Sequence, residues 1–327
     1  MIATINPTNF FLLLFTRTIV NGKLPAMSRM KLAAVSLTLL LASCTYETPG
    51  PPVEDAVGVT VDSARVTVLD AGQGDKQVLS YRDIGKKQEV DYTLEEGFSQ
   101  DLMQKSAVEG FRPANLDSAR TTLPLSASVE EATQDEAQAP ASRNANFLVE
   151  TPEYSEGDIS SAEGFQFGWR AEDDGQVSSL RLAAPQDADD DARSVTEQAI
   201  VHLASLPVIF PEEEIGEGAR WTVESRVAGE TAVIQTTTYT LDSFKDGVAQ
   251  LSLDIEQRPT VGALAMEEEE LEVLDTKSES SGQLTVNVNE PLPNDGHLEV
   301  TTQVIYGTEG DDLRVVQSTQ TRLEFAS

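Results

Sequence analysis

Cys44 is the one cysteine of the chain, and it directly follows Leu41, Ala42 and Ser43. A lone cysteine cannot form an internal disulfide, so its chemistry is that of a single nucleophilic sulfur. Small residues before a cleavage point suit a signal peptidase, and the first 43 residues contain no Asp or Glu although the chain has 55. We therefore expect residues 1–43 to be a signal peptide that is removed before Cys44.

The segment before Cys44 has the parts of such a leader. Arg29 and Lys31 form a short basic region, and Leu32–Leu41 is an apolar run of about half the roughly 20 residues needed to span a bilayer. Residues 1–26 do not fit this order, so we expect the true start at Met27 or Met30. A second membrane segment over Phe10–Phe15 is the alternative for those residues, and an ordinary transmembrane anchor is the alternative for the leader.

The sequence Leu41-Ala42-Ser43-Cys44 resembles the lipobox of bacterial lipoproteins. The resemblance implies a diacylglycerol on the Cys44 sulfur, cleavage before Cys44 and, often, acylation of the new amine, for example with palmitate. It implies a protein that is lipid-anchored at the extracytoplasmic face of the cell membrane.

Charge narrows the choice of partners. The leader holds four basic residues, so the remaining 284 residues carry 19 basic and 55 acidic side chains, a formal charge of −36. This charge repels nucleic acid and anionic headgroups, so we expect no nucleic-acid partner and a membrane contact through the lipid anchor alone. A cationic partner is compatible with the charge, although solubility explains it more simply. We expect a monomer.

Elements can be placed along the remaining chain. Residues 44–62 contain Pro49-Gly50-Pro51-Pro52 and are expected to form a flexible tether. From Ala64 onward apolar residues alternate with polar ones, as Val90, Tyr92 and Leu94 do, which is typical of half-buried strands. We predict a mainly β fold of long antiparallel curved sheets with one central helix, divided into a first β half (63–186), a linking helix (187–206) and a second β half (207–327).

The helix is the one break in the period of two. Val195, Ala199 and Leu203 follow helical spacing within Ala192–Ser205, and Pro207 ends it. Asp189, Asp190 and Asp191 precede this stretch, where carboxylates can cap free backbone N–H groups.

The two β halves share a short echo. Tyr92-Thr93-Leu94-Glu95-Glu96-Gly97-Phe98 in the first half is echoed, one residue shorter, by Tyr239-Thr240-Leu241-Asp242-Ser243-Phe244 in the second. The echo is either a chance match or the trace of two similar curved sheets joined by the helix. Glu130–Asn144 and Pro259–Gly282 are poor in core residues and are expected to be long loops.

The most distinctive motif follows the helix. Leu206-Pro207 is followed by Gly216-Glu217-Gly218-Ala219-Arg220-Trp221. With the lipobox, the acidic strand-rich body and the central helix, this motif resembles a family of uncharacterised actinobacterial cell-envelope lipoproteins. That family has no known activity, so it implies no catalytic residues. We interpret Gly216 and Gly218 as turn residues and Trp221 as a core residue, since a phosphate loop needs a third glycine and a following helix.

Signals for metal or acid–base chemistry are weak. The acidic clusters at Asp187–Asp191 and Glu267–Glu270 lack calcium-loop spacing and are interpreted as a helix cap and a solvated loop. His202 and His297 are far apart and belong to no zinc motif. We expect no catalytic residue, no metal and no cofactor.

Three functional hypotheses remain, in decreasing order of preference. The first is a non-enzymatic lipoprotein that binds an apolar or lipid ligand in a cavity between curved sheets and helix. The second is an envelope interaction or scaffold protein without a small-molecule site. The third is a carboxylate-dependent hydrolase.

Overall fold

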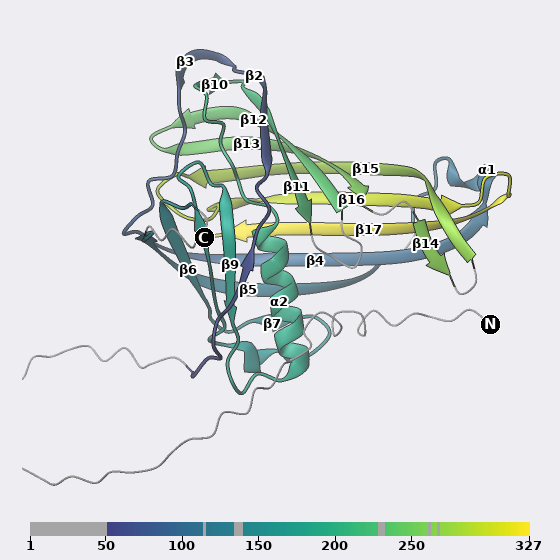
Figure 1. The fold of residues 1–327 in the computed structure, drawn as a ribbon, viewed down its shortest axis with the longest axis horizontal. Helices are drawn as coiled ribbons and strands as arrows, with labels where there is room; N and C mark the ends of the chain where they lie inside the picture. Colours follow the sequence, from purple (N-terminus) through teal and green to yellow (C-terminus); the bar gives the residue numbers. More distant parts are fainter. Residues whose placement is uncertain (1–50, 114–115, 134–139, 228–232, 261–262, 267–268) are drawn as a thin grey trace, which may run out of the picture. The chain divides into compact units, whose positions relative to one another are not determined.

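The computed structural model describes residues 51–113, 116–133, 140–227, 233–260, 263–266 and 269–327. The leader residues 1–43, the start candidates Met27 and Met30, and Cys44 with Leu41–Ser43 before it lie outside this described part. Figure 1 shows the arrangement of its elements.

The elements of the first half are β1 (Val57–Thr60), β2 (Arg65–Asp70), β3 (Gln73–Gln77), β4 (Lys87–Gln104), α1 (Lys105–Val108), β5 (Asp117–Glu131), β6 (Arg143–Val149), β7 (Glu153–Tyr154), a 3-10 turn (Ser160–Ala162), β8 (Gln166–Ala171) and β9 (Val177–Ala183). The helix α2 (Asp190–Ala204) follows. The second half contains β10 (Ile215–Glu217), β11 (Arg220–Val227), β12 (Val233–Lys245), β13 (Val248–Pro259), β14 (Ala263–Met266), β15 (Glu269–Asn287), β16 (Asp295–Gly307) and β17 (Leu313–Ala326).

The strands form one large antiparallel sheet, which confirms the mainly β prediction. Its order is β1-β9-β8-β6-β5-β4-β17-β16-β15-β13-β12-β11-β2, while β3 and β10 pair separately. Apart from β2, which joins β11, the strands of each half are neighbours in this order, and the two runs meet where β4 pairs with β17. The halves share one sheet and one core rather than forming two separate sheets. The echoed tyrosines lie on β4 and β12, both fully buried.

The two edges of this sheet are held together by consecutive residues. β1 pairs with β9 at one edge, and β2 pairs with β11 at the other. Only residues 61–64 separate β1 from β2, so Thr60 and Arg65 lie no more than about 19 Å apart. The Val61 N–H donates to Ser178 O (3.1 Å), and Gln176 Nε2 donates to Ala64 O (3.1 Å). The sheet must therefore curl until its edges face each other.

α2 packs on the inner face of the curled sheet, which we define as the face that carries Tyr92 and Leu94. Ala199, Ile200 and Leu203 of the helix join the large apolar cluster formed by that face. The helix begins two residues before the predicted start, because the Asp189 side chain accepts a hydrogen bond from the Ala192 N–H (2.8 Å) and caps the first turn.

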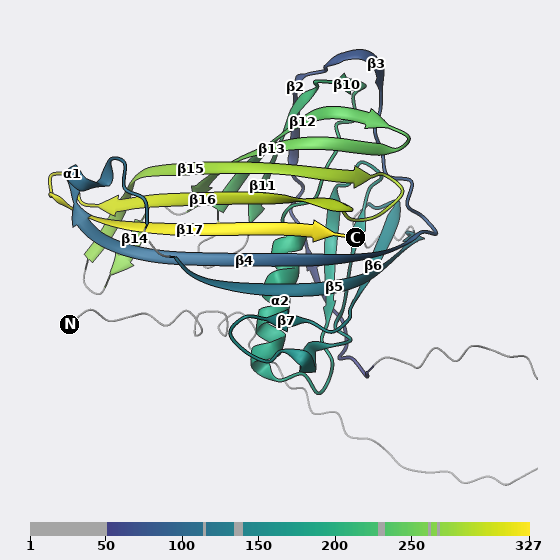
Figure 2. The same cartoon turned by 180° about the vertical axis from the view of Figure 1, so that it is seen from behind.

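Two regions of the sheet can be distinguished in Figures 1 and 2. The packed region comprises α2, the strands β6, β8, β9 and β11 around it, and residues 87–96 of β4, 281–287 of β15, 295–301 of β16 and 320–326 of β17. The far region is the continuation of the long strands beyond α2 toward α1. It comprises residues 97–104 of β4, 269–280 of β15, 302–307 of β16 and 313–319 of β17, with the adjoining residues 233–237 of β12 and 254–259 of β13.

Two sequence predictions differ from this structure. Pro259–Gly282, expected to be a loop, contains β14 and most of β15. The apolar alternation is missing there because Lys277, Ser278 and Glu279 lie in the far region, where neither face of β15 joins the large apolar cluster. The tether expected over 44–62 is bound to the body in its last part, because the Glu54 N–H donates to Ala184 O (2.8 Å) and β1 pairs with β9.

Candidate binding surface

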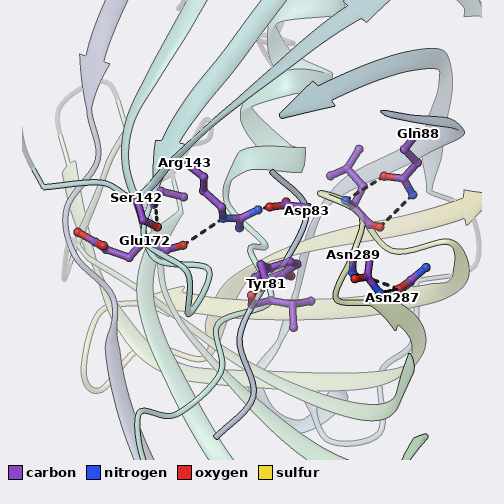
Figure 3. A network of polar contacts seen from close by, with 11 residues as sticks. Tyr81, Asp83, Gln88, Ser142, Arg143, Glu172, Asn287 and Asn289 are labelled. Atoms are coloured by element: carbon purple, nitrogen blue, oxygen red, sulfur yellow. Dashed lines mark hydrogen bonds and ion pairs between the residues drawn. The ribbon is translucent and has the colours of Figure 1, made fainter. Parts of the chain in front are cut away.

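The packed region contains a buried ion pair between Arg143 of β6 and Asp83, which precedes β4 (Figure 3). Arg143 Nε also donates to Glu172 O (3.1 Å), and the guanidinium carbon lies 4.0 Å from the centre of the Tyr81 ring. Tyr81 in turn donates through its hydroxyl to Val208 O (3.2 Å). Arg143 of β6 thus contacts the turn after β8 and the segment before β4 that carries Tyr81 and Asp83.

Burial governs the protonation of this network. Burial raises the pKa of the Asp83 carboxyl, while Arg143 opposes the rise. Burial also raises the pKa of the Tyr81 hydroxyl beyond its ordinary range. Asp83 is neutralised by a cation rather than paired with a second acid, so the network serves to hold segments together.

A second contact closes the same end of the sheet. Gln88 Nε2 donates to Leu292 O (3.0 Å), and the Leu292 N–H donates to Gln88 Oε1 (3.1 Å). These two hydrogen bonds fix the Pro291–Pro293 turn against β4, as Figure 3 shows for Gln88.

The cavity beside this network is small. It lies between Tyr81, Arg143, Trp169, Leu203 and Phe325, with a volume of about 30 Å³. That is room for about one water molecule, whereas small-molecule sites measure roughly 300–1,000 Å³. An apolar ligand does not fit in this cavity.

The glycine and tryptophan motif lies at the border of this core. Trp221 is fully buried, donates through Nε1 to Ile209 O (2.8 Å) and stacks on Tyr239 with ring centres 5.3 Å apart. A methyl group on Gly216 would lie 2.3 Å from Gln73 O in β3, and Gly218 has φ +78°. Both glycines therefore occupy positions where a side chain is strained.

The two histidines lie in different parts of the structure, His202 on α2 and His297 on β16. His202 Nε2 lies 2.9 Å from Glu96 Oε1, and Gln198 Nε2 donates to Glu96 Oε2 (2.7 Å). Two side chains of α2 therefore contact the Glu96 carboxylate of β4. His297 pairs with Glu324 in the β16–β17 ladder, in another part of the sheet. Among the described residues, no three His, Asp or Glu side chains gather in a way that could hold a metal ion.

The inner face of the far region carries a ladder of polar side chains across four strands. Gln257 Nε2 donates to Gln235 Oε1 (2.9 Å), and Thr302 Oγ1 donates to Gln257 Oε1 (2.9 Å). Ser278 Oγ lies 3.1 Å from Thr302 Oγ1. Gln235 and Thr302 are buried, so this ladder is a satisfied internal network that fixes the strands relative to one another.

Ser278 and Ser280 also bridge a divergence of two strands. The pairing of β13 with β15 ends at Leu253 opposite Gly282. Beyond it, the Ile255 N–H donates to Ser280 Oγ (2.6 Å) and the Gln257 N–H to Ser278 Oγ (3.1 Å). Hydroxyl groups thus replace carbonyl acceptors where the strands separate.

Beside the ladder, three large apolar side chains of the inner face are exposed. Phe98 and Leu102 of β4 are 42% and 66% exposed, and Leu313 of β17 is 50% exposed. β4 and β17 are neighbours, with Leu102 opposite Val315 and Leu313 opposite Gln104. We call Phe98, Leu102 and Leu313 the apolar strip.

The outer face behind the strip is covered. Leu116 lies directly over Gly97, and Arg112 forms an ion pair with Glu279. Pairing in register places Gly97 and Glu279 on the same face of β4 and β15, so the chain between β4 and β5 crosses the intervening strands. Ser318 on that face is fully buried. The far region thus has one protected face and one open apolar strip.

The sequence analysis did not single out the apolar strip. The available signal was that Phe98 and Leu102 follow Leu94 at intervals of four residues, on the same face of a strand, within the otherwise polar run Glu95–Gln104. Partial exposure is invisible to that pattern, because a buried and an exposed leucine have the same period.

Comparison with known proteins gives one partial match. Residues 197–293 match the model of a family of unknown function (DUF6263). The match runs from within α2 to the turn before β16 and includes Gly216, Gly218 and Trp221, but it covers under a third of the chain. No curated protein matches the chain. These similarities point to an uncharacterised domain and leave the function to be argued from the residues.

Proposed function

We propose that this chain is a non-enzymatic lipoprotein, anchored through Cys44 at the extracytoplasmic face of the membrane, that binds an envelope partner through the apolar strip. The leader composition and Leu41-Ala42-Ser43-Cys44 support the anchor. The resemblance to actinobacterial cell-envelope lipoproteins supports the location. None of the helices in the described part is long and apolar enough to cross a membrane.

The contrast between the two regions carries the proposal for binding. The cavity beside α2 has a volume of only about 30 Å³, whereas Phe98, Leu102 and Leu313 are exposed together on one face. Scattered apolar residues on a surface are ordinary, but a cluster of large ones marks a contact site. This favours an interaction or scaffold protein over a carrier that encloses its ligand.

An apolar or lipid ligand is the second candidate. The same three side chains would contact an acyl chain laid along the inner face of β4 and β17. A hydrolase draws no support from the packed region, because its buried carboxylate, Asp83, is paired with Arg143.

The anchor is tested by comparing Cys44→Ser with Ser43→Ala. Cys44→Ser is expected to move the protein from the membrane fraction to the soluble fraction, and Ser43→Ala, which keeps a small residue before the cleavage point, should stay bound. Mass spectrometry of the N-terminal peptide should show acyl mass on wild-type Cys44. Equal retention of Cys44→Ser, or a wild-type peptide without acyl mass, would overturn the anchor.

Partner binding is tested by placing a photoreactive amino acid at Leu102 in the lipidated protein within its own cells. The matched position is Leu69 on β2, which is 54% exposed outside the far region. We expect a discrete protein adduct from position 102 and none of the same mass from position 69. Native mass spectrometry of the purified protein distinguishes the second candidate, since a co-purifying lipid that Leu102→Ser removes would favour the lipid ligand.

A further inference from the structure

We propose that the apolar strip binds a cationic amphipathic segment of a partner protein, with basic residues facing the acidic side chains around the strip. This inference rests on the proposed function and specifies the chemistry of the partner. The argument comes from the pairing register of the strands and from the charges that border the three apolar side chains.

The strip has the dimensions of one side of a short peptide segment. Phe98 and Leu102 lie on the same face of β4, four residues or about 13 Å apart. Leu313 lies on the neighbouring strand β17, two residue pairs from the Leu102–Val315 pair. Because the outer face is covered by the chain between β4 and β5, the strip is presented on a sheet that is supported from behind.

Acidic side chains border both ends of the strip. Asp117 of β5 is paired directly with Phe98, and Glu96 lies two residues before Phe98 on the same face of β4. Glu309, Asp311 and Asp312 form the turn that leads into Leu313, and all three are exposed. Two basic residues adjoin this turn: the Lys105 backbone N–H donates to Asp312 O (2.7 Å), and Arg314 Nη1 donates to Asp311 O (2.8 Å). Negative charge therefore exceeds positive charge around the apolar side chains.

This border selects among possible occupants. A second copy of residues 44–327 would bring another formal charge of −36, and an anionic lipid surface would add further negative charge. A neutral acyl chain would cover the strip but would leave the flanking carboxylates partly desolvated without a counter-charge. A segment with apolar residues on one side and Lys or Arg beside them matches both the strip and its border.

The experiment uses the chain from Thr45 to Ser327, which contains every residue of the two apolar clusters. The probes are two fluorescent 14-residue helical peptides with the same apolar face, one of Leu and Lys and the other of Leu and Glu. Fluorescence anisotropy should show saturable binding of the Leu/Lys peptide, weakened by 0.5 M salt, and no binding of the Leu/Glu peptide. Vesicles of anionic phospholipid should not bind.

Variants separate the strip from the general acidity of the body. Leu102→Ser combined with Leu313→Ser should weaken the affinity for the Leu/Lys peptide by about tenfold or more. Asp117→Asn combined with Glu309→Gln should weaken the same affinity severalfold and reduce the salt dependence of binding. Leu69→Ser, at an exposed leucine outside the far region, should leave the affinity unchanged.

Either of two results would overturn the inference. One is equal binding of the Leu/Lys peptide to wild type and to the Leu102→Ser, Leu313→Ser variant, which would assign the binding to net charge alone. The other is equal binding of both peptides, which would remove the role of the acidic border. Failure of the proposed function is a separate outcome, since it requires position 102 to give no adduct in cells.

Discussion

The strand β4 passes through two environments along one inner face. In the packed region its Tyr92 and Leu94 are 0% and 2% exposed beneath α2, while in the far region its Phe98 and Leu102 are 42% and 66% exposed. The backbone pairing is continuous, because β4 is paired with β17 from Asp91 to Gln104. The comparison shows that the long strands do not need a covered inner face to form.

Different interactions hold the two regions. The packed region has a filled apolar core, a buried arginine–aspartate pair and prolines that close its end. The far region relies on strand pairing, the polar ladder around Gln257 and Thr302, and the covering of its outer face. Substitutions in the packed region should therefore change stability, whereas those in the apolar strip should change binding.

The largest loss of stability is expected for Trp221→Ala. It removes a fully buried aromatic side chain, its stacking on Tyr239 and its hydrogen bond to Ile209 O. We expect the free energy of unfolding to fall by about 3–5 kcal/mol, measured by urea denaturation. A loss below about 1 kcal/mol would mean that the packed region is less tightly filled than the structure indicates.

Asp83→Ala is expected to destabilise by a similar or slightly smaller amount, about 3–5 kcal/mol, because it leaves the Arg143 charge buried without its partner. Adding Arg143→Met removes that charge and should restore most of the loss. Urea denaturation of the two single variants and the double variant measures the coupling. Additive losses would contradict the view that the two side chains act as a pair.

Thr302→Val tests the polar ladder. The valine keeps the shape of the side chain but removes the hydroxyl that donates to Gln257 Oε1, so a loss of about 1–2 kcal/mol is expected in the free energy of unfolding. Thr301→Val, one residue earlier on the outer face of β16, is the control and should stay within about 0.5 kcal/mol. Equal effects would show that the ladder does not stabilise the far region.

Much of the packed region was predictable from the sequence. In the far region the period of two at Val304 and Tyr306 and at Leu313 and Val315 indicates β16 and β17, but β15 could not be predicted. The period of two at Val90, Tyr92 and Leu94, and the helical spacing of Val195, Ala199 and Leu203, report burial on one face. β15 was hidden because its residues Lys277–Ser281 pair with β16 without an apolar face. The closure of the sheet through β1 and β2 was hidden as well, since it depends on which distant strands each one joins.

The candidate site was harder to predict for a physical reason. Sequence patterns show which residues share a face, but the end of α2 determines where that face becomes exposed. Glu96, held by His202 and Gln198 of the helix, marks this boundary on β4. The ion pair of Asp83 with Arg143 has no local signal, because 60 residues separate the two side chains.

A pH effect is expected in the packed region at Glu172. Burial, with repulsion from Asp174 and Asp173, raises the pKa of Glu172 above its ordinary value of 4.5. The folded chain then binds the proton more readily than the unfolded chain, so the free energy of unfolding falls as pH rises from about 4.5 through the folded pKa. Glu172→Gln should raise the stability at pH 7 by up to about 1 kcal/mol and have no effect near pH 4. Urea denaturation at both pH values measures this, and an equal effect of Glu172→Gln at the two pH values would contradict the raised pKa.

The smallest effect on stability is expected for Leu102→Ala, and it bears most directly on the comparison. Leu102 and Leu94 point from the same face of the same strand, but only Leu94 is buried. Leu94→Ala should therefore cost about 2–5 kcal/mol in the free energy of unfolding, while Leu102→Ala should stay within about 0.5 kcal/mol. If Leu102→Ala costs as much as Leu94→Ala, Leu102 belongs to the core and the far region is not an open surface. If the stability of Leu102→Ala is unchanged while adduct formation at position 102 and binding of the Leu/Lys peptide both require this face, the packed region stabilises the fold and the far region binds the partner.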